Sequence, residues 1–314
     1  MARSLKILVV SNSVYPRGNE AVLDTSIPYI YNPLTELGHS VYFFDTVGVM
    51  GDPQIKNNRN TPLLECVRSC DPDVIFCCLT GNKFITPVEP SVEEIRKITD
   101  LGYTTFNWFC DDTWRFEDFS KIYCKAFTYC STPEKAYIPK YKEIGYDNIL
   151  LGGWHASQDM YNHRKYKDNN VVFVGGISGV RQKFFDSIKT PISFGQNLQI
   201  DQMCSFLCGG KIGLNLSVND NDPKKGTQMK QRIFELAAAQ CLILSEHHDG
   251  ISDFFDIGEE VITFRTPEEF DEKARYYLDN PEEAKTIAQK AHDRFTREHE
   301  SKIRLTSILE QING

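Results

Sequence analysis

The residues with the clearest chemical potential lie between positions 226 and 245, where a loop leads into a helix and then a strand. Lys230 and Arg232 fall in or near the first turn of the expected helix, where an exposed positive charge opposes the helix dipole and costs on the order of 0.3–1 kcal/mol. A bound diphosphate would reverse that sign. Glu235, one turn further on, could accept hydrogen bonds from both ribose hydroxyls. The segment therefore predicts a nucleoside-diphosphate site, and an Arg232–Glu235 ion pair on a solvated helix face explains it equally well.

A second potential anion site follows the apolar run Val171–Val174. Gly175 and Gly176 would let a phosphate or a sugar approach the backbone, because they carry no side chain. Arg181 stands near the start of the helix expected next, and a helix N-terminus favours anions. The glycine pattern alone is weak evidence for this site.

Two adjacent carboxylates, Asp111 and Asp112, follow the apolar run Thr105–Phe109 and lie between Trp108 and Trp114. Carboxylates at the end of a strand can accept a proton or bind sugar hydroxyls, and aromatic rings can stack on sugars. The alternative is that Asp112 caps the next helix. A metal site is less favoured, because adjacent residues of a strand point in opposite directions.

Two weaker candidates lie outside these motifs. His155, beside Trp154, is a fallback catalytic base, although a lone histidine in such a position is more often structural. The polar loop Ser11–Glu20 follows the apolar run Ile7–Val10, and it is equally well an ordinary turn between a strand and a helix. It contains no G-x-G-x-x-G pattern, so a dinucleotide fingerprint is absent.

The elements that must position these residues are short apolar, β-branched or aromatic runs at the spacing of βα units. The expected strands are Ile7–Val10, Val41–Asp45, Val74–Leu79, Thr105–Phe109, Ala126–Cys130 and Ile149–Leu151 in one series, and Val171–Val174, Ile192–Phe194, Ile212–Leu216, Leu242–Ser245 and Val261–Phe264 in a second. Strands that alternate with helices predict parallel sheets with crossover helices. The sequence therefore predicts an α/β protein with two doubly wound domains.

The polar stretch 155–169 predicts the joint, which gives domains over 1–158 and 159–298 and a C-terminal helix over 299–314 that could pack back on the first domain. Helix starts are indicated by capping residues at Ser91 and Thr266 and by Asn280 before a proline. The apolar face of the last helix would comprise Ile303, Leu305, Ile308, Leu309 and Ile312.

Composition limits the function classes. The chain has 314 residues, and its formal charge of 35 − 43 = −8 disfavours general binding of nucleic acid or anionic membranes. Its ten cysteines lie mostly in apolar runs without zinc spacing, which predicts reduced core thiols and a reducing compartment. With no signal peptide and no run of eighteen apolar residues, we expect a cytoplasmic protein without a membrane span.

The segment Arg232–Ile243 resembles the R-x-F-E-x-x-A-x-G-x-L-x segment of the CgeB-like glycosyltransferases, relatives of the group 1 (GT4-like) enzymes. Further resemblances occur in the same order along most of the chain. They are the W-F-x-D-D element at Phe109–Trp114, the F-x-G-x…R element from Phe173 to Arg181, a strand that ends in Asn215, and the closing helices from Gly258 to Arg304.

The resemblance implies a GT-B fold, in which two Rossmann-like domains face each other across a cleft and the second domain holds the donor. Lys230 and Arg232 would neutralise the diphosphate and Glu235 would bind the ribose. Gly175, Gly176, Arg181 and Asn215 would belong to the donor site, and Asp111 or Asp112 would face the sugar. The co-substrate would be a nucleoside-diphosphate sugar, with UDP- or GDP-sugars as first candidates, and no metal or other cofactor is expected.

Two residues depart from the family pattern. Thr227 stands where group 1 enzymes often have a second glutamate, and Gln240 replaces a glycine. The leading hypothesis is a hexosyl- or pentosyltransferase with an unknown acceptor. The alternatives are a non-catalytic protein that binds sugar nucleotides, a phage-type enzyme that glycosylates a modified DNA base, which the acidic charge disfavours, and a nucleotide-sugar epimerase.

Overall fold

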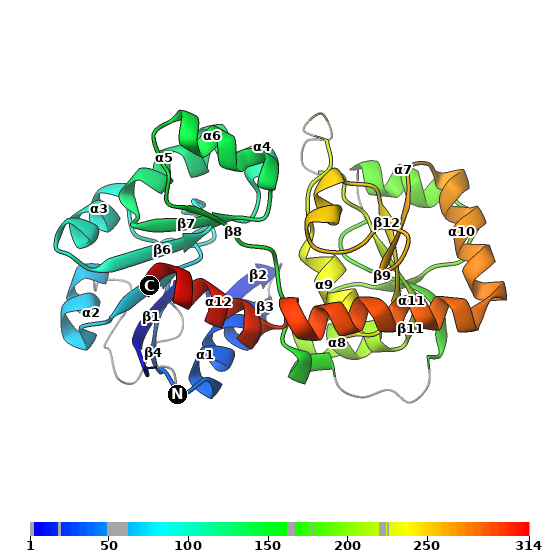
Figure 1. The fold of residues 1–314 in the computed structure, drawn as a ribbon, viewed down its shortest axis with the longest axis horizontal. Coiled ribbons are helices and arrows are strands. Elements are labelled where there is room, and N and C mark those ends of the chain that lie inside the picture. Colours follow the sequence, from blue (N-terminus) through cyan, green and yellow to red (C-terminus); the bar gives the residue numbers. More distant parts are fainter. Residues whose placement is uncertain are drawn as a thin grey trace. The chain divides into compact units, whose positions relative to one another are not determined.

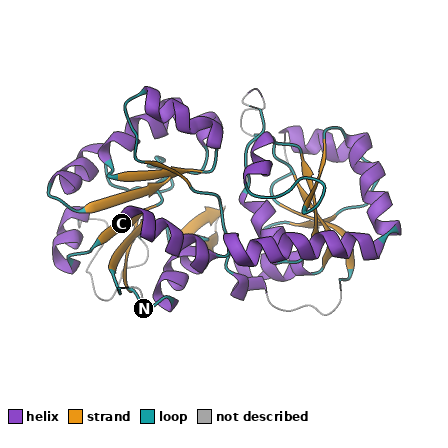
Figure 2. Ribbon diagram, viewed as in Figure 1, coloured by secondary structure: helices purple, strands orange, loops and turns teal. Residues whose placement is uncertain are grey.

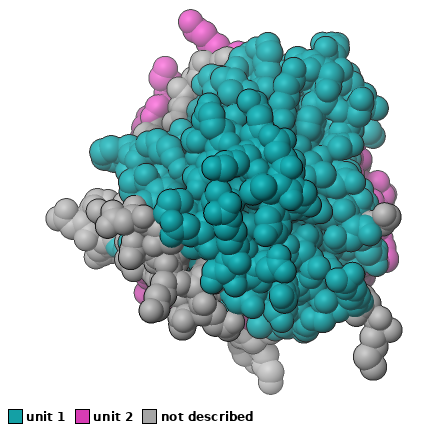
Figure 3. Space-filling model, turned by 90° about the vertical axis from the view of Figure 1, so that its left-hand side faces the viewer, with its two compact units in different colours: residues 1–152, 305–314 teal, residues 153–304 magenta. Residues whose placement is uncertain are grey.

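The computed structural model describes residues 3–17, 20–48, 62–161, 167–177, 179–219, 224 and 226–313 (Figure 1). Contacts between residues divide the chain into two compact units, which Figure 3 colours separately. The first unit comprises Met1–Gly152 and Leu305–Gly314, and the second comprises Gly153–Arg304. The sequence places the first domain boundary at 158, and the contacts place it between Gly152 and Gly153. Each unit is described by itself.

The first unit is built on a six-stranded parallel sheet with the order β4-β1-β5-β6-β7-β8. Its strands are β1 (Lys6–Ser11), β4 (Ser40–Asp45), β5 (Val74–Cys77), β6 (Thr104–Trp108), β7 (Tyr129–Thr132) and β8 (Ile149–Leu151). Its helices are α1 (Asn32–Glu36), α2 (Leu63–Cys70), α3 (Val92–Asp100), α4 (Asp112–Arg115), α5 (Lys121–Tyr123) and α6 (Ile138–Glu143). Helices flank the sheet, and the strands are nearly continuous apolar runs because both faces are covered (Figure 2).

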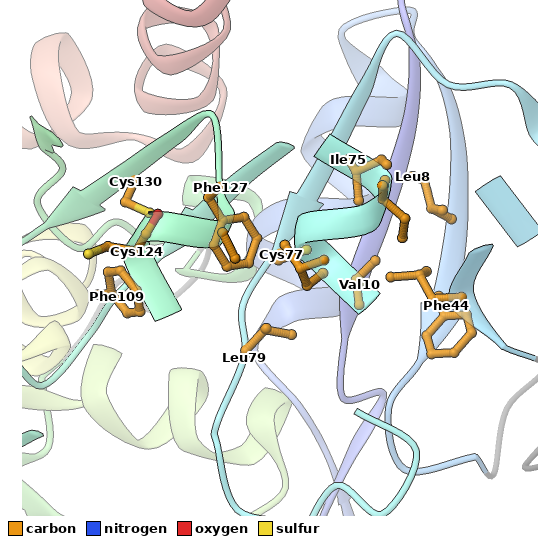
Figure 4. Packing of buried hydrophobic residues seen from close by; sticks show 14 of the residues in the cluster. Leu8, Val10, Phe44, Ile75, Cys77, Leu79, Phe109, Cys124, Phe127 and Cys130 are labelled. Atoms are coloured by element: carbon orange, nitrogen blue, oxygen red, sulfur yellow. Dashed lines mark hydrogen bonds between the residues drawn. The ribbon is translucent and has the colours of Figure 1, made fainter. Parts of the chain in front are cut away.

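One core of the first unit joins the central strands to the helices that cover them. Leu8 and Val10 of β1, Ile75 and Cys77 of β5 and Phe44 of β4 pack together in it (Figure 4). Burial of these side chains fixes the sheet, so the loops at the carboxyl ends of the strands start from a rigid base.

A β-hairpin follows β1 in the first unit. It pairs β2 (Val14–Arg17) with β3 (Glu20–Leu23) in antiparallel register. Of the two interpretations of the loop Ser11–Glu20, the ordinary turn between a strand and a helix is wrong, because a hairpin follows β1. The overlooked signal is Gly18-Asn19, a dipeptide typical of hairpin turns between two β-prone runs, which itself lies outside the described residues.

The second unit contains a five-stranded parallel sheet with the order β10-β9-β11-β12-β13. Its strands are β9 (Asn169–Val174), β10 (Ser193–Gly195), β11 (Gly210–Asn215), β12 (Leu242–Glu246) and β13 (Val261–Phe264). Its helices are α7 (Gly179–Ser187), α8 (Ile200–Cys208), α9 (Gln231–Ala238), α10 (Pro267–Asp279) and α11 (Pro281–Arg294). Helix α12 (Ser301–Asn313) begins in this unit, and its residues from Leu305 onward belong to the first unit.

Most local signals of the sequence are confirmed. Ser91 and Thr266 cap α3 and α10 through bonds from Glu94 N and Glu269 N, and α11 starts at Pro281. Two predictions are wrong. The strand expected at Ala126–Cys130 starts later, as β7 at Tyr129, because a 3-10 turn ends at Ala126. Ile303, expected on the buried face of α12, is 47% exposed.

The ten cysteines are all unpaired thiols, as the sequence predicts, and eight of them are buried. Across the described ranges, no helix combines the length and the apolar character that a bilayer crossing requires.

Candidate functional site

The carboxyl edge of the second sheet is the first candidate region. Strand β9 has β10 on one side and β11 on the other, so the order in which the chain adds strands to the sheet reverses between β9 and β11. In open α/β sheets, ligands bind beyond the carboxyl ends of the strands at such a switch point. β9 leads into Gly175-Gly176, and β11 ends at Asn215. The fold therefore brings these predicted residues to one edge.

The loop after β9 is shaped by its glycines. Gly175 has φ +149°, a conformation that favours glycine, and a Cβ atom there would lie 3.2 Å from the ring of Phe173. Gly176 is exposed, and a Cβ atom there would meet nothing within 4 Å. The carbonyl of Gly176 accepts a hydrogen bond from Arg181 Nη1 at 3.4 Å. Arg181 thus contacts the glycine loop itself, and the backbone at Gly176 can be approached from solvent.

The start of α9 carries the predicted phosphate and ribose residues. Lys230 is the N-cap residue, with extended backbone (φ −112°, ψ 141°), and it is half-buried. Arg232 Nη1 lies 2.5 Å from Glu235 Oε2, with side-chain exposures of 19% and 4%. The ion pair predicted as the alternative is therefore present, but it is not on a solvated face. The prediction that both cations are exposed is wrong, because Lys230 and Arg232 are both half-buried. Arg232 is covered because α9 packs against α8, where Met203 Sδ lies 3.4 Å from Arg232 Nη1.

Asn215 has a structural role in this conformation. It is 1% exposed, and its amide donates to Ser245 Oγ at 2.8 Å and to Ser217 Oγ at 3.1 Å. Ser217 Oγ in turn donates to the carbonyl of Glu246, whose carboxylate accepts from Val218 N at 2.8 Å. This network ties the ends of β11 and β12 together, so a direct donor contact by Asn215 stays a prediction.

Two histidines that sequence reasoning missed follow β12 at the same edge. His248 Nδ1 lies 3.1 Å from Thr227 Oγ1, and His247 Nε2 lies 3.1 Å from Asp249 Oδ1. Thr227 belongs to the segment that leads into Lys230, so His248 stands beside the approach to α9. The sequence contains one signal for this site, a His-His pair directly after a predicted strand. The contact with Thr227 could not be predicted from a local pattern, because the two residues are 21 positions apart.

A cavity of about 270 Å³ opens at the carboxyl ends of β11 and β13, beside α7. Its walls include Arg181, Leu216, Val218, Phe264 and Arg265. A mainly apolar wall with a few polar groups is typical of small-molecule sites. The second unit therefore offers a glycine loop, a cationic helix start and a cavity at one edge.

The first unit places the two adjacent aspartates in different environments. Asp111 is half-buried and is the N-cap residue of α4, with no hydrogen bond from its side chain to the cap positions. Asp112 is fully buried, and its Oδ2 accepts from the hydroxyl of Tyr141 at 2.8 Å. Burial raises the pKa of the Asp112 carboxyl, against hydrogen bonds that lower it. Asp112 is therefore held inside the unit, which leaves Asp111 as the aspartate that a ligand can reach.

His155 is also buried. It is 1% exposed, and its Nδ1 lies 2.8 Å from Ser301 Oγ at the start of α12. Burial, and secondarily the charge of Arg304, holds the pKa of His155 well below its usual range. This placement favours a structural role, and the fallback assignment of His155 as a catalytic base stays a prediction.

A polar network that the sequence indicated only as a loop lies at the switch point between β1 and β5. Asn12 Nδ2 donates to Asp24 Oδ2 at 2.7 Å, and Ser26 Oγ donates to Asp24 Oδ1 at 2.5 Å. Asp45 accepts from Ser13 N at 2.9 Å. Burial raises the pKa of Asp24. Asn12 and Asp24 thus join Asp111 among the polar groups at the carboxyl edge of the first sheet.

Comparisons with known proteins agree with this organisation. Residues 159–310 match the model of a family described as glycosyl transferase-like. No curated protein matches the chain. The solved structures that resemble it include HepE from Anabaena in complex with UDP and glucose, with 10% identity and a TM-score of 0.65 over 98% of this chain and 99% of that one.

Two further structures show the same likeness. Sucrose-phosphate synthase from Thermosynechococcus elongatus has 9% identity and a TM-score of 0.65 over 99% of both chains. An alpha-glucosyltransferase in complex with UDP and a 13-mer DNA containing an HMU base has 10% identity and a TM-score of 0.59 over 99% of this chain and 100% of that one. The chain has the GT-B fold, as its sequence predicts.

Proposed function

We propose that this protein is a glycosyltransferase that moves a hexosyl or pentosyl group from a nucleoside-diphosphate sugar to a hydroxyl group, and that its second unit binds the donor. The observation that carries the proposal is the start of α9, the helix that connects β11 to β12, where Lys230 is the N-cap residue and Arg232 pairs with Glu235. The same residues fall inside the segment that matches the glycosyl transferase-like family model.

The donor chemistry follows from charge. The diphosphate leaves as an anion, and preorganised cations and helix dipoles stabilise the charge that develops on it. Lys230 and Arg232 would supply that charge at the start of α9, and Gly175 and Gly176 would let the donor approach the backbone. Glu235, held by Arg232, would accept the ribose hydroxyls. UDP-sugars are the first candidates because the similar HepE structures contain UDP or UDP-glucose, and GDP-sugars are the second.

The acceptor chemistry belongs to the first unit. An acceptor hydroxyl must lose its proton as the glycosidic bond forms, and a carboxylate within hydrogen-bond reach can take it. Asp111 would be this base, and the buried Asp112 would fix the start of α4. Because the cations of α9 supply the countercharge, we propose that no metal and no other cofactor is needed, so the chelator EDTA should leave turnover unchanged.

The finer family assignment rests on the resemblance of the motifs. We propose that the protein belongs to the CgeB-like glycosyltransferases, because the R-x-F-E segment, the glycine loop and the W-F-x-D-D element occur in the order of that family. Ten unpaired thiols support a reducing, cytoplasmic location.

The DNA-bound glucosyltransferase among the similar structures favours a second candidate, the transfer of a sugar to a modified DNA base. The formal charge of −8 argues against it, because binding to a phosphate backbone depends on a basic surface. A non-catalytic sugar-nucleotide binder would bind the donor without cleaving it.

A donor screen tests the proposal. UDP, GDP, ADP and CMP are added in a thermal-shift assay, where a ligand at 100 times its Kd stabilises the protein by about 2.7 kcal/mol. The UDP- or GDP-sugar that corresponds to the stabilising nucleotide is then followed for hydrolysis and transfer. Stabilisation by a nucleoside diphosphate together with donor cleavage supports the proposal. Stabilisation without cleavage supports the non-catalytic alternative, and no stabilisation by any nucleotide would remove the donor site.

A further inference from the structure

Phe84 is far more exposed to solvent than the other large apolar residues of the described ranges. Its side chain is 93% exposed, whereas no other large apolar side chain in the described ranges exceeds the 52% of Leu101. It lies in the loop that joins β5 to α3 in the first unit. Single exposed apolar residues are common on protein surfaces. The surroundings of Phe84 distinguish it from those residues.

The loop that carries Phe84 is fixed by a buried carboxylate. Glu89 is 3% exposed and accepts hydrogen bonds from the backbone N of Thr80 and of Gly81, both at 2.7 Å, and from Thr86 Oγ1 at 2.9 Å. The ammonium group of Lys83 donates to the carbonyl of Glu89. These bonds hold both ends of the loop to one buried group.

The turn at the tip is fixed in the same way. Asn82 Oδ1 accepts from Phe84 N at 3.1 Å, and the carbonyl of Asn82 accepts from Thr86 N at 2.8 Å. A ring presented by a preorganised backbone loses little conformational entropy when a ligand covers it. The loop therefore holds an aromatic ring ready for a partner.

The position of the loop relates it to Asp111. The guanidinium of Arg115 donates to the carbonyl of Thr80, and a Cβ atom at Gly81 would lie 2.5 Å from the ring of Phe119. The loop thus packs on the segment that follows Asp111. Tyr15, which is 45% exposed on β2, follows the neighbouring strand β1. Phe84 and Tyr15 thus lie in the segments that follow the adjacent strands β5 and β1, at the edge that carries Asp111.

The charges at this edge indicate the class of ligand. Among the carboxylates in the described segments at the ends of the strands, Asp45, Glu89, Asp112 and Glu134 are buried, and Asp24 and Asp111 are half-buried. Asp111 is therefore a carboxylate that a ligand can reach. The formal charge of −8 disfavours a phosphate backbone, which needs clustered cations. A neutral sugar suits this edge, because the carboxylate of Asp111 can accept hydrogen bonds from hydroxyls and the electron-rich face of an aromatic ring attracts the C–H face of a pyranose.

We infer that Phe84 is a stacking platform for a pyranose ring of a carbohydrate acceptor, and so a specificity-determining residue of the transfer. The inference rests on the proposed function, since it names the acceptor class of the same reaction. Stacking of this kind is worth a factor of roughly 2 to 10 in affinity. Phe84→Ala should therefore raise the KM for the acceptor by that factor and leave kcat and the KM for the donor unchanged, and Phe84→Tyr should retain the stacking.

The direct test is a fluorine NMR titration of the full chain. Phe84→4-fluorophenylalanine reports on the ring itself, and Leu101→4-fluorophenylalanine is the matched control. Leu101 is 52% exposed in the same unit, but it follows α3 and so lies at the opposite edge of the sheet. The probes are the methyl glycosides of glucose, galactose, mannose and N-acetylglucosamine, and a single-stranded DNA 13-mer. UDP binding is measured on the same samples by calorimetry.

We expect a saturable shift at position 84, and none at position 101, with at least one methyl glycoside. A shift with the DNA and with no glycoside would overturn the carbohydrate assignment in favour of a nucleic-acid acceptor. Equal shifts at both positions, or no shift with any probe, would overturn the platform itself. Failure of UDP to bind would contradict the proposed function, and it is read independently of the fluorine signal.

Discussion

The carboxyl edges of the two sheets share a topology and differ in their side chains. Both sheets are parallel, and in each the strand order reverses beside the first strand of the unit, at β1–β5 and at β9–β11. The edge of the second unit presents a glycine loop and the cationic start of α9. The edge of the first unit presents buried carboxylates, the half-buried Asp111 and the exposed Phe84.

In the proposed function, the fold supplies the place of each ligand and the side chains supply its chemistry. The basic residues at the start of α9 suit an anionic donor, and Asp111 with the exposed Phe84 suits a neutral acceptor and the removal of a proton. The two edges can be tested separately, because a change in one should alter one substrate and leave the binding of the other intact.

The largest effect is expected at the edge of the first unit. If Asp111 is the proposed base, Asp111→Asn should reduce turnover by about 10²-fold or more, the usual size of a lost general base. Donor affinity by calorimetry should barely change, because the proposed phosphate site belongs to the other unit. The fold should survive, since Asn is nearly as good an N-cap residue as Asp.

Asp112→Asn is the matched control for this prediction. Its side chain is buried on Tyr141, and Asn can still accept that hydrogen bond, so turnover should stay within a few-fold of the parent. Full activity of Asp111→Asn would exclude Asp111 as the base. A large loss in Asp112→Asn without a loss of stability would reverse the assignment of the two aspartates.

The next effect is expected at the cationic edge. Lys230→Ala would remove the proposed charge-assisted contact to the donor phosphates, which is worth about 1.5–3 kcal/mol, or roughly a 10- to 150-fold rise in the Kd for the nucleoside diphosphate. Lys230 is half-buried at the N-cap of α9, so the variant should fold. Lys224→Ala, an exposed residue before the same helix, is the control. Unchanged affinity in Lys230→Ala would remove this residue from the phosphate site.

The sequence predicts the strands of both sheets well because the central strands, such as β1, β5 and β12, are local apolar runs with almost every residue buried. It does not predict which of two adjacent aspartates is buried, because Tyr141, which decides this, is 29 residues from Asp112. For the same reason, the sequence does not predict the contact between His248 and Thr227, the burial of Glu235 or the exposure of Ile303. Each depends on packing between elements, and a local pattern contains no information about that packing.

A smaller, coupled effect is expected at Glu235. Glu235→Gln keeps the shape of the side chain but removes its charge, and with it the ion pair to Arg232. If Glu235 binds the ribose, the variant should lose affinity for UDP, and 2′-deoxy-UDP should lose less affinity in the variant than in the parent. Calorimetry of the two proteins with the two ligands gives the coupling energy, and additive losses would exclude the contact.

The smallest effect on turnover is expected at His155, where the main effect of a substitution should be on stability. Burial holds the folded-state pKa of His155 well below its unfolded value, so protonation on acidification favours the unfolded chain. The stability contributed by neutral His155 is complete above an unfolded pKa of about 6.5 and falls as the pH drops below it. His299, whose pKa is lowered to about 4 chiefly by burial, adds a loss of the same sign.

His155→Gln, which can still bond to Ser301, should therefore unfold in urea with a weaker pH dependence than the parent, although His299 keeps part of the slope. Its kcat at neutral pH should be close to that of the parent. A large fall in kcat together with an unchanged pH dependence of unfolding would mean that His155, and not Asp111, is the residue to examine as the base.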